Sequence, residues 1–275
     1  IMGRQDLDLK TFKIKRSILL KESNSNTSVL NGLVKKGILR IEEAEVGRLR
    51  SYEGALKALP DLSEEQSEVY NSINKQFVEK DVVLLHGVTG SGKTEVYIKL
   101  IQDAIDKEEQ VLYLLPEIAL TTQIIVRLQK IFGDAVGVYH SKFNLNERVE
   151  LWKDLIKGKN SKYKIILGAR SSLFLPFQNL GLVIVDEEHE NTFKQFDPAP
   201  RYHGRDLAIV LAKISKGKVL LGSATPSVES FFNANTNKYG FVELKKRYSG
   251  VQLPEVQCGD LKEEKKRKKM VSLFT

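Results

Sequence analysis

The stretch GVTGSGKT at residues 87–94 decides the fold, because it fits the pattern G-x-x-x-x-G-K-[ST] between a predicted strand and a predicted helix. Its glycines allow backbone N–H groups to approach phosphate oxygens closely, and the following helix adds the positive end of its dipole. We expect Lys93 to reach the β- and γ-phosphates of ATP and Thr94 to hold Mg²⁺. The predicted nucleotide-contacting residues of this loop are Gly87, Gly90, Ser91, Gly92, Lys93 and Thr94. The alternative is a glycine turn without a ligand.

Around this loop, short apolar segments alternate with amphipathic segments from residue 62 onward. The predicted strands are residues 82–85, 111–115, 136–139, 165–167, 182–185 and 219–221, and the predicted helices are residues 94–106, 119–132, 146–157 and 205–214. Continuous apolar strands separated by helices indicate a parallel sheet that is covered on both faces. The sequence therefore predicts an α/β domain over residues 61–245.

An acidic motif, DEEH at residues 186–189, directly follows the predicted strand at residues 182–185. Its carboxylates are therefore expected at the carboxyl end of a buried strand, where α/β sheets bind ligands. Asp186 is placed to hold Mg²⁺, directly or through water, and Glu187 to orient or deprotonate a water that attacks the γ-phosphate. The alternative is a solvated acidic turn.

Residues 1–60 have a different pattern. A helical pattern around residues 14–20 is followed by a polar turn, and Thr27 or Ser28 could then cap a second helix that ends at Gly37. Residues 38–46 are predicted to form a strand. This order predicts a winged-helix DNA-binding module with a linker near residue 60, and the alternative is a small helical cap on the next domain.

Composition limits the class of protein. The 275 residues carry 43 basic and 35 acidic side chains, a formal net charge of +8, which fits nucleic acid as a partner and equally fits an unspecific solvated surface. No apolar run approaches the roughly 20 residues of a membrane span, and because no charged-then-apolar segment opens the sequence we do not expect secretion. The single cysteine excludes a disulfide framework and a cysteine-cluster zinc site. Because the chain opens with Ile1, we expect a piece of a longer protein, although Met2 behind a cloning remnant would give the same start.

The order of the phosphate loop, the acidic motif and GSAT at residues 222–225 is similar to that of superfamily 2 helicases. Three further segments narrow the resemblance: LLPEIALTTQ at residues 114–123, YHS at residues 139–141 and GARSSLFLP at residues 168–176. Over residues 30–275 the chain resembles the PriA-type (primosomal protein N′) replication-restart helicases of bacteria. The resemblance implies a winged helix, the first RecA-like motor lobe, and an ATP-driven 3′→5′ DNA helicase that acts in primosome assembly in the cytoplasm, associated with the nucleoid.

The resemblance also implies roles for matching residues. Gln66 would read adenine through its amide, and the alternative is an exposed glutamine at a helix start. His189 would belong to the nucleotide site, and Ser223 and Thr225 would couple the γ-phosphate state to DNA contacts. Arg170 would bind a DNA phosphate, against the alternative of a structural ion pair. The residues expected to grip the DNA backbone are His140, Ser141, Arg170 and Ser171.

Aromatic and cationic side chains interleave in a proline-broken segment, residues 193–206, which we call the aromatic loop. Such a composition suits base stacking and phosphate contact, and the resembled family has a comparable loop that links DNA binding to hydrolysis. The residues predicted to contact DNA are Phe196, Arg201, Tyr202 and His203. The alternative is that these aromatics pack the loop onto its own domain. Trp152 is expected in the core.

The resemblance leaves parts of the family unaccounted for. A 3′-end-binding domain, a second motor lobe with an arginine finger and a zinc domain do not fit in this chain, so residues 246–275 are expected to be a linker toward a second lobe. Zinc is expected only in the rest of the parent protein, and the isolated chain is expected to be nearly inactive. The expected partners are forked and single-stranded DNA, single-stranded-DNA-binding protein and replicative-helicase loading factors, but no membrane. Competing hypotheses are a non-catalytic DNA-binding or primosome assembly module and another superfamily 2 DNA or RNA helicase.

Overall fold

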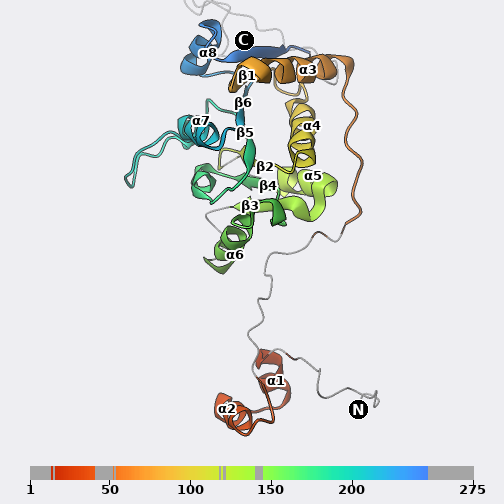
Figure 1. The fold of residues 1–275 in the computed structure, drawn as a ribbon, viewed down its shortest axis with the longest axis vertical. Coiled ribbons are helices and arrows are strands. Elements are labelled where there is room, and N and C mark those ends of the chain that lie inside the picture. Colours follow the sequence, from red (N-terminus) through yellow and green to blue (C-terminus); the bar gives the residue numbers. More distant parts are fainter. Residues whose placement is uncertain are drawn as a thin grey trace, which may run out of the picture. The chain divides into compact units, whose positions relative to one another are not determined.

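The computed structural model describes most of the chain. The described residues are 14, 16–40, 52, 54–117, 119, 122–139 and 145–246. The chain divides into two compact units, residues 1–47 and residues 48–275 (Figure 1). This boundary lies earlier in the chain than the domain boundary predicted at residue 60.

The first unit contains two described helices, α1 (Arg16–Glu22) and α2 (Thr27–Lys35). The cap of α2 lies one residue earlier than predicted, because Asn26 is extended and its Oδ1 accepts a hydrogen bond from Val29 N at 3.1 Å. Residues 38–40 form no strand, and residues 41–46 lie outside the described residues. The winged-helix module therefore stays a prediction.

The end of α2 follows the predicted glycine cap. Gly37 has a φ of +70°, the left-handed conformation that glycine adopts without steric cost. Gly37 N donates to Val34 O at 3.0 Å, and Ile38 N donates to Leu33 O at 3.1 Å. These two bonds form a Schellman motif, which satisfies the last carbonyls of the helix.

The described residues of the second unit form a seven-stranded parallel sheet with the strand order β3-β4-β2-β5-β6-β1-β7. The strands are β1 (Val82–Gly87), β2 (Gln110–Leu114), β3 (Val136–Tyr139), β4 (Ile165–Gly168), β5 (Leu180–Asp186), β6 (Lys218–Ser223) and β7 (Gly240–Leu244). The helices of this unit are α3 (Glu64–Glu79), α4 (Lys93–Asp106), α5 (Thr122–Phe132), α6 (Leu145–Leu155), α7 (Gly204–Ser215) and α8 (Val228–Asn235). The predicted RecA-like α/β class is confirmed, whereas the edge strand β7 was not predicted.

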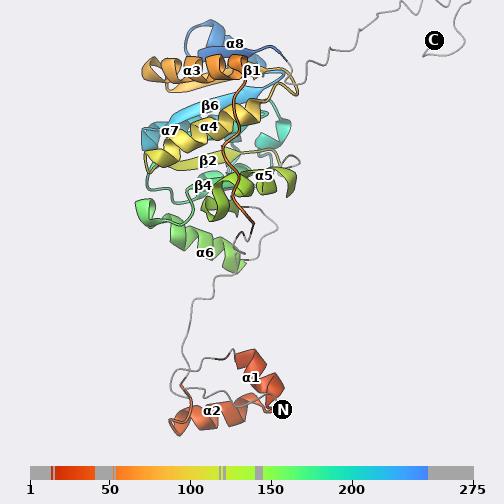
Figure 2. The same cartoon turned by 90° about the vertical axis from the view of Figure 1, so that its right-hand side faces the viewer.

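Helices cover both faces of this sheet. The apolar residues of α3, α4 and α5 share one core cluster, and those of α6, α7 and α8 share the other (Figures 1 and 2). Strand β1 contributes to both, because side chains alternate along a strand: Val83 and Leu85 enter the first cluster, and Val82 and Leu84 the second. The strand sequences are apolar without polar alternation because both faces of the sheet are buried under helices.

The segment before α3 is attached to this second unit and runs along the side that carries α4 and α5 (Figure 2). Lys57 N donates to Lys130 O of α5 at 2.7 Å, and Tyr52 N donates to Asp134 Oδ1 at 2.7 Å. Leu59 packs against the first core cluster. These contacts explain why the boundary between the two units precedes this segment.

Candidate nucleotide and DNA site

The predicted phosphate loop lies between the end of β1 at Gly87 and the start of α4 at Lys93. Gly90 and Gly92 have φ values of +77° and +85°, which a residue with a Cβ adopts only with strain. A Cβ on Gly92 would also overlap the side-chain amide of Gln66. The left-handed backbone explains the glycine at both positions, and the close approach of Gln66 is a second reason at Gly92.

Two side chains of the loop suit an anionic ligand. Lys93 is nearly buried, and its Nζ donates to Gly87 O at 2.9 Å and lies 3.9 Å from Glu187 Oε1. Ser91 Oγ is buried and has no hydrogen-bond partner among the described residues. A buried hydroxyl without a partner is costly, and a phosphate oxygen would supply one. The loop therefore fits a nucleotide phosphate on the evidence of its own geometry.

Asp186 ends β5, and two buried tyrosines hold its carboxylate. Tyr97 of α4 donates its hydroxyl to Oδ1 at 3.0 Å, and Tyr113 of β2 donates to Oδ2 at 3.1 Å. Burial raises the pKa of Asp186, and the neighbouring charge of Glu187 adds to that rise. Gly222 of β6 is the residue opposite Asp186, and a Cβ there would overlap the Tyr97 hydroxyl.

Sequence reasoning missed both tyrosines. They lie within apolar runs that read as ordinary core, and both side chains are indeed fully buried. Their hydroxyl groups could have indicated a polar contact, since a buried tyrosine hydroxyl usually has a hydrogen-bond partner. In this structure that partner is the carboxylate predicted to hold Mg²⁺.

Glu187 lies at the centre of the acidic motif. Its φ of +49° is left-handed, an uncommon conformation for a residue with a Cβ that concentrates at functional sites. One carboxylate oxygen lies 3.9 Å from Lys93 Nζ, and the other lies 3.7 Å from His189 Nδ1. The carboxylate thus lies between the phosphate loop and the last residue of its own motif.

His189 connects the acidic motif to the GSAT segment. Its Nδ1 lies 2.7 Å from Ser223 Oγ and its Nε2 lies 3.3 Å from Thr225 Oγ1, while Thr225 N donates to Ser223 Oγ at 3.0 Å. The two segments meet because β5 and β6 are neighbouring strands whose carboxyl ends lie at one edge of the sheet. The sequence-predicted residues His189, Ser223 and Thr225 therefore lie together beside Glu187.

Gln66 also contacts the phosphate loop. It forms a capping box with Ser63 at the start of α3, and its Nε2 donates to the carbonyls of Ser91 at 3.4 Å and Gly92 at 3.3 Å. Only 1% of its surface is exposed, so the alternative of an exposed helix-start glutamine is wrong. Adenine recognition by Gln66 stays a prediction, because its amide binds protein groups at both ends.

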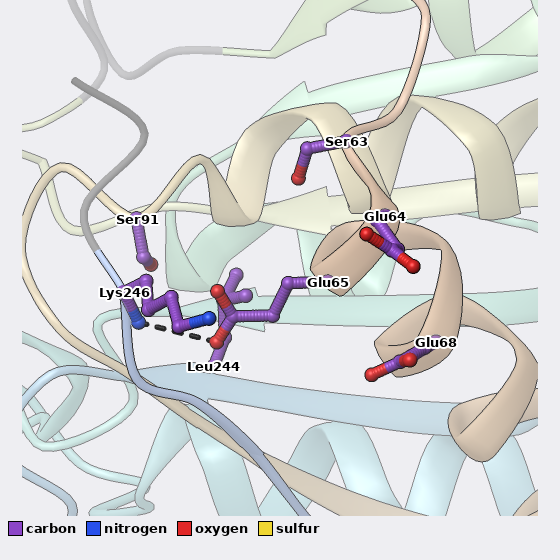
Figure 3. Close-up of a pocket in the computed structure, with 7 residues that line it drawn as sticks. All are labelled: Ser63, Glu64, Glu65, Glu68, Ser91, Leu244 and Lys246. Atoms are coloured by element: carbon purple, nitrogen blue, oxygen red, sulfur yellow. Dashed lines mark hydrogen bonds between the residues drawn. The ribbon is translucent and has the colours of Figure 1, made fainter. Parts of the chain in front are cut away.

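A pocket of about 470 Å³ lies beside the phosphate loop (Figure 3). It is lined by Ser63, Glu64, Glu65, Glu68, Ser91, Leu244 and Lys246. Glu65 extends across it, and its Oε1 accepts hydrogen bonds from Lys245 N at 3.0 Å and Lys246 N at 3.2 Å. The other carboxylates suit hydroxyl and amino donors and repel phosphate, so the pocket fits the nucleoside end of a nucleotide.

Arg170 contacts the aromatic loop. It begins the 3₁₀ helix η3 (Arg170–Phe174), and its Nη1 donates to Thr192 O at 2.7 Å and Lys194 O at 3.0 Å. The guanidinium therefore holds the start of the loop through main-chain carbonyls. Phosphate binding by Arg170 and by its half-buried neighbour Ser171 stays a prediction.

The aromatic loop has a fixed base and an exposed end (Figure 1). Lys194 and His203 pair in an antiparallel bridge, and Gln195 N donates to Tyr202 O at 2.9 Å. Phe196 is 67% exposed and Arg201 is exposed as well, both free to meet a ligand.

The base of this loop is partly packed, as the alternative hypothesis expected. The Tyr202 ring meets Phe174 of η3 edge to face, with ring centroids 5.4 Å apart. Burial lowers the pKa of the half-buried His203. Phe174, which is itself half exposed, was missed by sequence reasoning because it lies in a different motif.

Two predicted DNA contacts stay predictions, and one prediction about the core was wrong. His140 and Ser141 lie outside the described residues. Trp152 was expected in the core but is 44% exposed, because Leu151 and Leu155 of α6 take the inward face. That expectation was wrong.

Thr94 and Asp186 offer the hard oxygen ligands that Mg²⁺ prefers, and protein Mg²⁺ sites usually combine one or two carboxylates with substrate phosphates. The described residues contain no group of three or more His, Cys, Asp or Glu that could hold a metal ion by itself. In the same part of the chain, no helix has the length and apolar character required to cross a membrane.

Residues 63–232 match the DEAD/DEAH box helicase family. The match covers more than half of the chain and contains the phosphate loop, the acidic motif and the GSAT segment. The chain therefore belongs to the DEAD/DEAH box helicases.

Within that family the chain is similar to PriA proteins. It is 39% identical over 272 residues to "Replication restart protein PriA" of Chlamydia muridarum, covering 97% of this chain and 36% of that protein. It is 44% identical over 207 residues to the protein of the same name from Rickettsia felis, covering 75% and 31%. The chain thus spans about a third of the length of these relatives. Among solved structures, RecG bound to a three-way DNA junction is 18% identical with a TM-score of 0.46, covering 80% of this chain and 26% of that one.

Proposed function

We propose that this chain is the first, nucleotide-binding lobe of an ATP-driven 3′→5′ DNA helicase that acts in the restart of stalled replication forks. The observation that carries the proposal is the meeting of three segments: Lys93 of the phosphate loop faces Glu187, and Glu187 lies beside His189, which contacts Ser223 and Thr225. The similarity to PriA proteins supports DNA as the substrate and replication restart as the process.

In this proposal the residues around the phosphate loop bind the nucleotide. Ser91 and the N–H groups of the loop hold phosphate oxygens, and Lys93 exchanges its bond to Gly87 O for the β- and γ-phosphates. Thr94 and Asp186 would hold Mg²⁺, which neutralises charge that develops on the phosphates. The carboxylate-lined pocket next to Ser91 takes the nucleoside.

Glu187 orients a water for attack on the γ-phosphate and accepts its proton. Its position between Lys93 and His189 supports this role, because loss of the γ-phosphate would change the charge around the carboxylate. His189 then passes a change in Glu187 to Ser223 and Thr225, which lie on the segment that leads to α8. The aromatic loop, with Phe196, Arg201, Tyr202 and His203, supplies DNA contacts together with His140, Ser141, Arg170 and Ser171.

The proposal extends to the parent protein. We propose that the parent protein also contains a winged helix, a second motor lobe and a zinc-binding domain. Its proposed partners are single-stranded-DNA-binding protein and replicative-helicase loading factors, and its proposed location is the nucleoid. Residues 1–60 would contribute to DNA binding and residues 246–275 would connect to the second lobe.

The test is ATP hydrolysis by the full-length protein with forked DNA, with single-stranded DNA, with duplex RNA and without nucleic acid. We expect strong stimulation by the two DNA substrates and little by RNA. An equal rate with and without DNA would contradict the helicase proposal and favour an assembly module, and stimulation by RNA alone would favour an RNA helicase. Unwinding of substrates with a single 3′ or 5′ tail then tests the direction of movement.

A further inference from the structure

Glu188, the third residue of the acidic motif, has a fully buried side chain that does not face the nucleotide site. Its Oε1 accepts a hydrogen bond from Ser227 N at 2.7 Å. Its Oε2 accepts from Ser227 Oγ at 3.0 Å, Ser230 Oγ at 2.8 Å and Arg205 Nη1 at 3.1 Å. One buried carboxylate thus accepts hydrogen bonds from two other segments of the chain, the start of α7 and the start of α8.

Arg205 is the charged partner of this carboxylate and is only 8% exposed. It lies at the end of the aromatic loop, in the first turn of α7. Its Nε donates to Asp206 Oδ1 at 2.8 Å, and its Nη1 also donates to Ser227 Oγ at 2.6 Å and Ser230 Oγ at 3.4 Å. Burial acts to lower the pKa of Arg205, but Asp206 and Glu188 outweigh it and keep the guanidinium charged.

The chain positions of these residues suggest a role beyond packing. Glu188 lies between Glu187 and His189. Ser227 and Ser230 belong to the start of α8, directly after the GSAT segment, and Ser227 is the N-cap of that helix. Arg205 lies at the base of the aromatic loop, two residues after His203. The network therefore joins the three segments that a DNA-stimulated ATPase has to coordinate.

A buried charge pair resists partial separation. Removing Arg205 from Glu188 would leave an uncompensated carboxylate in the interior, which is strongly unfavourable. A displacement of the aromatic loop that reaches Arg205 at its base therefore has to carry Glu188 with it. The neighbouring Glu187 and His189 lie on the same short turn and would move as well. This gives the loop a physical connection to the water-orienting carboxylate.

We propose that Glu188 and Arg205 form a positioning pair that transmits DNA engagement by the aromatic loop to Glu187 and to the GSAT segment. This inference rests on the proposed function, because it assumes that DNA stimulates hydrolysis. It assigns the pair a role in coupling, and neither residue contacts the nucleotide. Loss of the pair should lower the DNA-stimulated kcat and leave nucleotide affinity and the DNA-independent rate close to those of the wild type.

The deciding variant is the full-length protein with Arg205→Met and Glu188→Gln together. Both charges are removed, and glutamine keeps an acceptor for Ser227 N and a donor for the serine hydroxyls. Since neutral replacement of a buried ion pair is often tolerated, we expect the double variant to regain most of the Tm that Arg205→Met alone loses. We expect its stimulation by single-stranded DNA to remain at least about tenfold below that of the wild type, a loss of about 1.4 kcal/mol.

A matched control separates coupling from stability. Asp154 is another buried carboxylate, bound to Ser161 Oγ at 2.6 Å and Tyr163 N at 3.2 Å in the other half of the sheet. Asp154→Asn should lower Tm and leave the ratio of DNA-stimulated to basal hydrolysis unchanged. A merely structural role for Glu188 and Arg205 predicts that the double variant regains its DNA stimulation together with its Tm, and that result would overturn the inference.

Binding of a fluorescent ATP analogue shows whether each variant is folded around the phosphate loop. If the double variant fails to bind it, Glu188→Gln alone decides, because Arg205 then keeps Asp206 and both serines. Full stimulation of that single variant overturns the coupling role, and a tenfold loss supports it. A wild-type protein without any DNA stimulation would overturn the proposed function and this inference together, whereas a stimulated wild type with equally stimulated variants overturns only the inference.

Discussion

The phosphate loop follows β1 and the aromatic loop follows the acidic motif at the end of β5, yet the protein holds the two loops in opposite ways. The phosphate loop is fixed along its length by Gln66 and Lys93, and its buried Ser91 hydroxyl still lacks a hydrogen-bond partner in the part of the chain that the structure describes. The aromatic loop is fixed only at its base, and Phe196 extends into solvent. The nucleotide site is thus preformed, whereas the expected DNA site keeps an exposed, adaptable end.

This difference suits the two ligands. A triphosphate has one shape, so rigid donors lower the entropy lost on binding. Single-stranded DNA presents a variable sequence of bases, and an exposed aromatic can stack on any of them. Predictions that treat the two loops separately can test whether this division of roles is correct.

The largest expected effect comes from Lys93→Ala in the full-length protein. The lysine holds the loop through Gly87 O and is the only cation within 4 Å of Glu187 among the described lysines and arginines. We expect ATP hydrolysis to fall to background, with a stability loss of about 1 kcal/mol from the lost hydrogen bond. Steady-state ATPase and thermal unfolding measure the two effects, and normal turnover would contradict the phosphate-loop assignment.

The isolated chain provides the next largest effect. Phosphoryl transfer in related ATPases depends on an arginine finger worth roughly 10³–10⁵ in rate, and the resembled family carries it on a second lobe. We therefore expect residues 1–275 to hydrolyse ATP at least 10³-fold more slowly than the full-length protein. The control is the full-length protein at the same concentration of single-stranded DNA. DNA-stimulated turnover by the isolated chain near that of the parent would place the arginine within this chain.

Phe193 and Phe196 allow a matched test of the aromatic loop, because one is buried and the other is exposed. Phe193 is fully buried in the core, so Phe193→Ala should cost about 3–5 kcal/mol of stability. Phe196 is exposed, so Phe196→Ala should leave Tm nearly unchanged and weaken binding of single-stranded DNA by about 1–3 kcal/mol. Chemical denaturation and fluorescence anisotropy measure these values. Unchanged DNA affinity and DNA stimulation in Phe196→Ala would return the loop to the packing hypothesis.

The parts of the molecule that sequence predicted are those where local pattern and tertiary structure agree. The phosphate loop needs glycine for its left-handed residues, and the central strands need apolar side chains on both faces, so both leave a strong local signal. Strand β7 lies at the edge of the sheet and alternates in burial, and it was missed because only continuous apolar runs were sought. Trp152 and the Asn26 cap were assigned wrongly for a similar reason, since neighbouring residues offered equally good alternatives.

The side-chain contacts of the acidic motif could not be predicted from its amino-acid sequence. Glu187 and Glu188 are identical in the sequence, but the turn directs one toward Lys93 and the other into the interior toward Arg205. Tyr97 and Tyr113 lie on different elements and meet only because α4 and β2 both pack against β5. Long-range pairing of this kind depends on strand order, which residue spacing does not encode.

The smallest expected effect concerns Asp186 in the nucleotide-free protein. Burial raises the pKa of this carboxyl in the folded state, so its contribution favours folding when it is protonated, at pH below its unfolded value near 4, and is lost as the pH rises through the folded value. At neutral pH the charge therefore opposes folding, and Asp186→Asn should raise Tm by a few degrees, since 1 kcal/mol corresponds to about 2–4 °C for a domain of this size. The gain in Tm should shrink as the pH falls toward 4.

Tyr113→Phe is the matched control, because it removes a hydroxyl that donates to the charged carboxylate and should lower Tm at neutral pH. A lower Tm for Asp186→Asn at pH 7 would mean that the tyrosine hydroxyls and Lys93 fully compensate the buried charge, and that this part of the preformed nucleotide site is held without cost to stability.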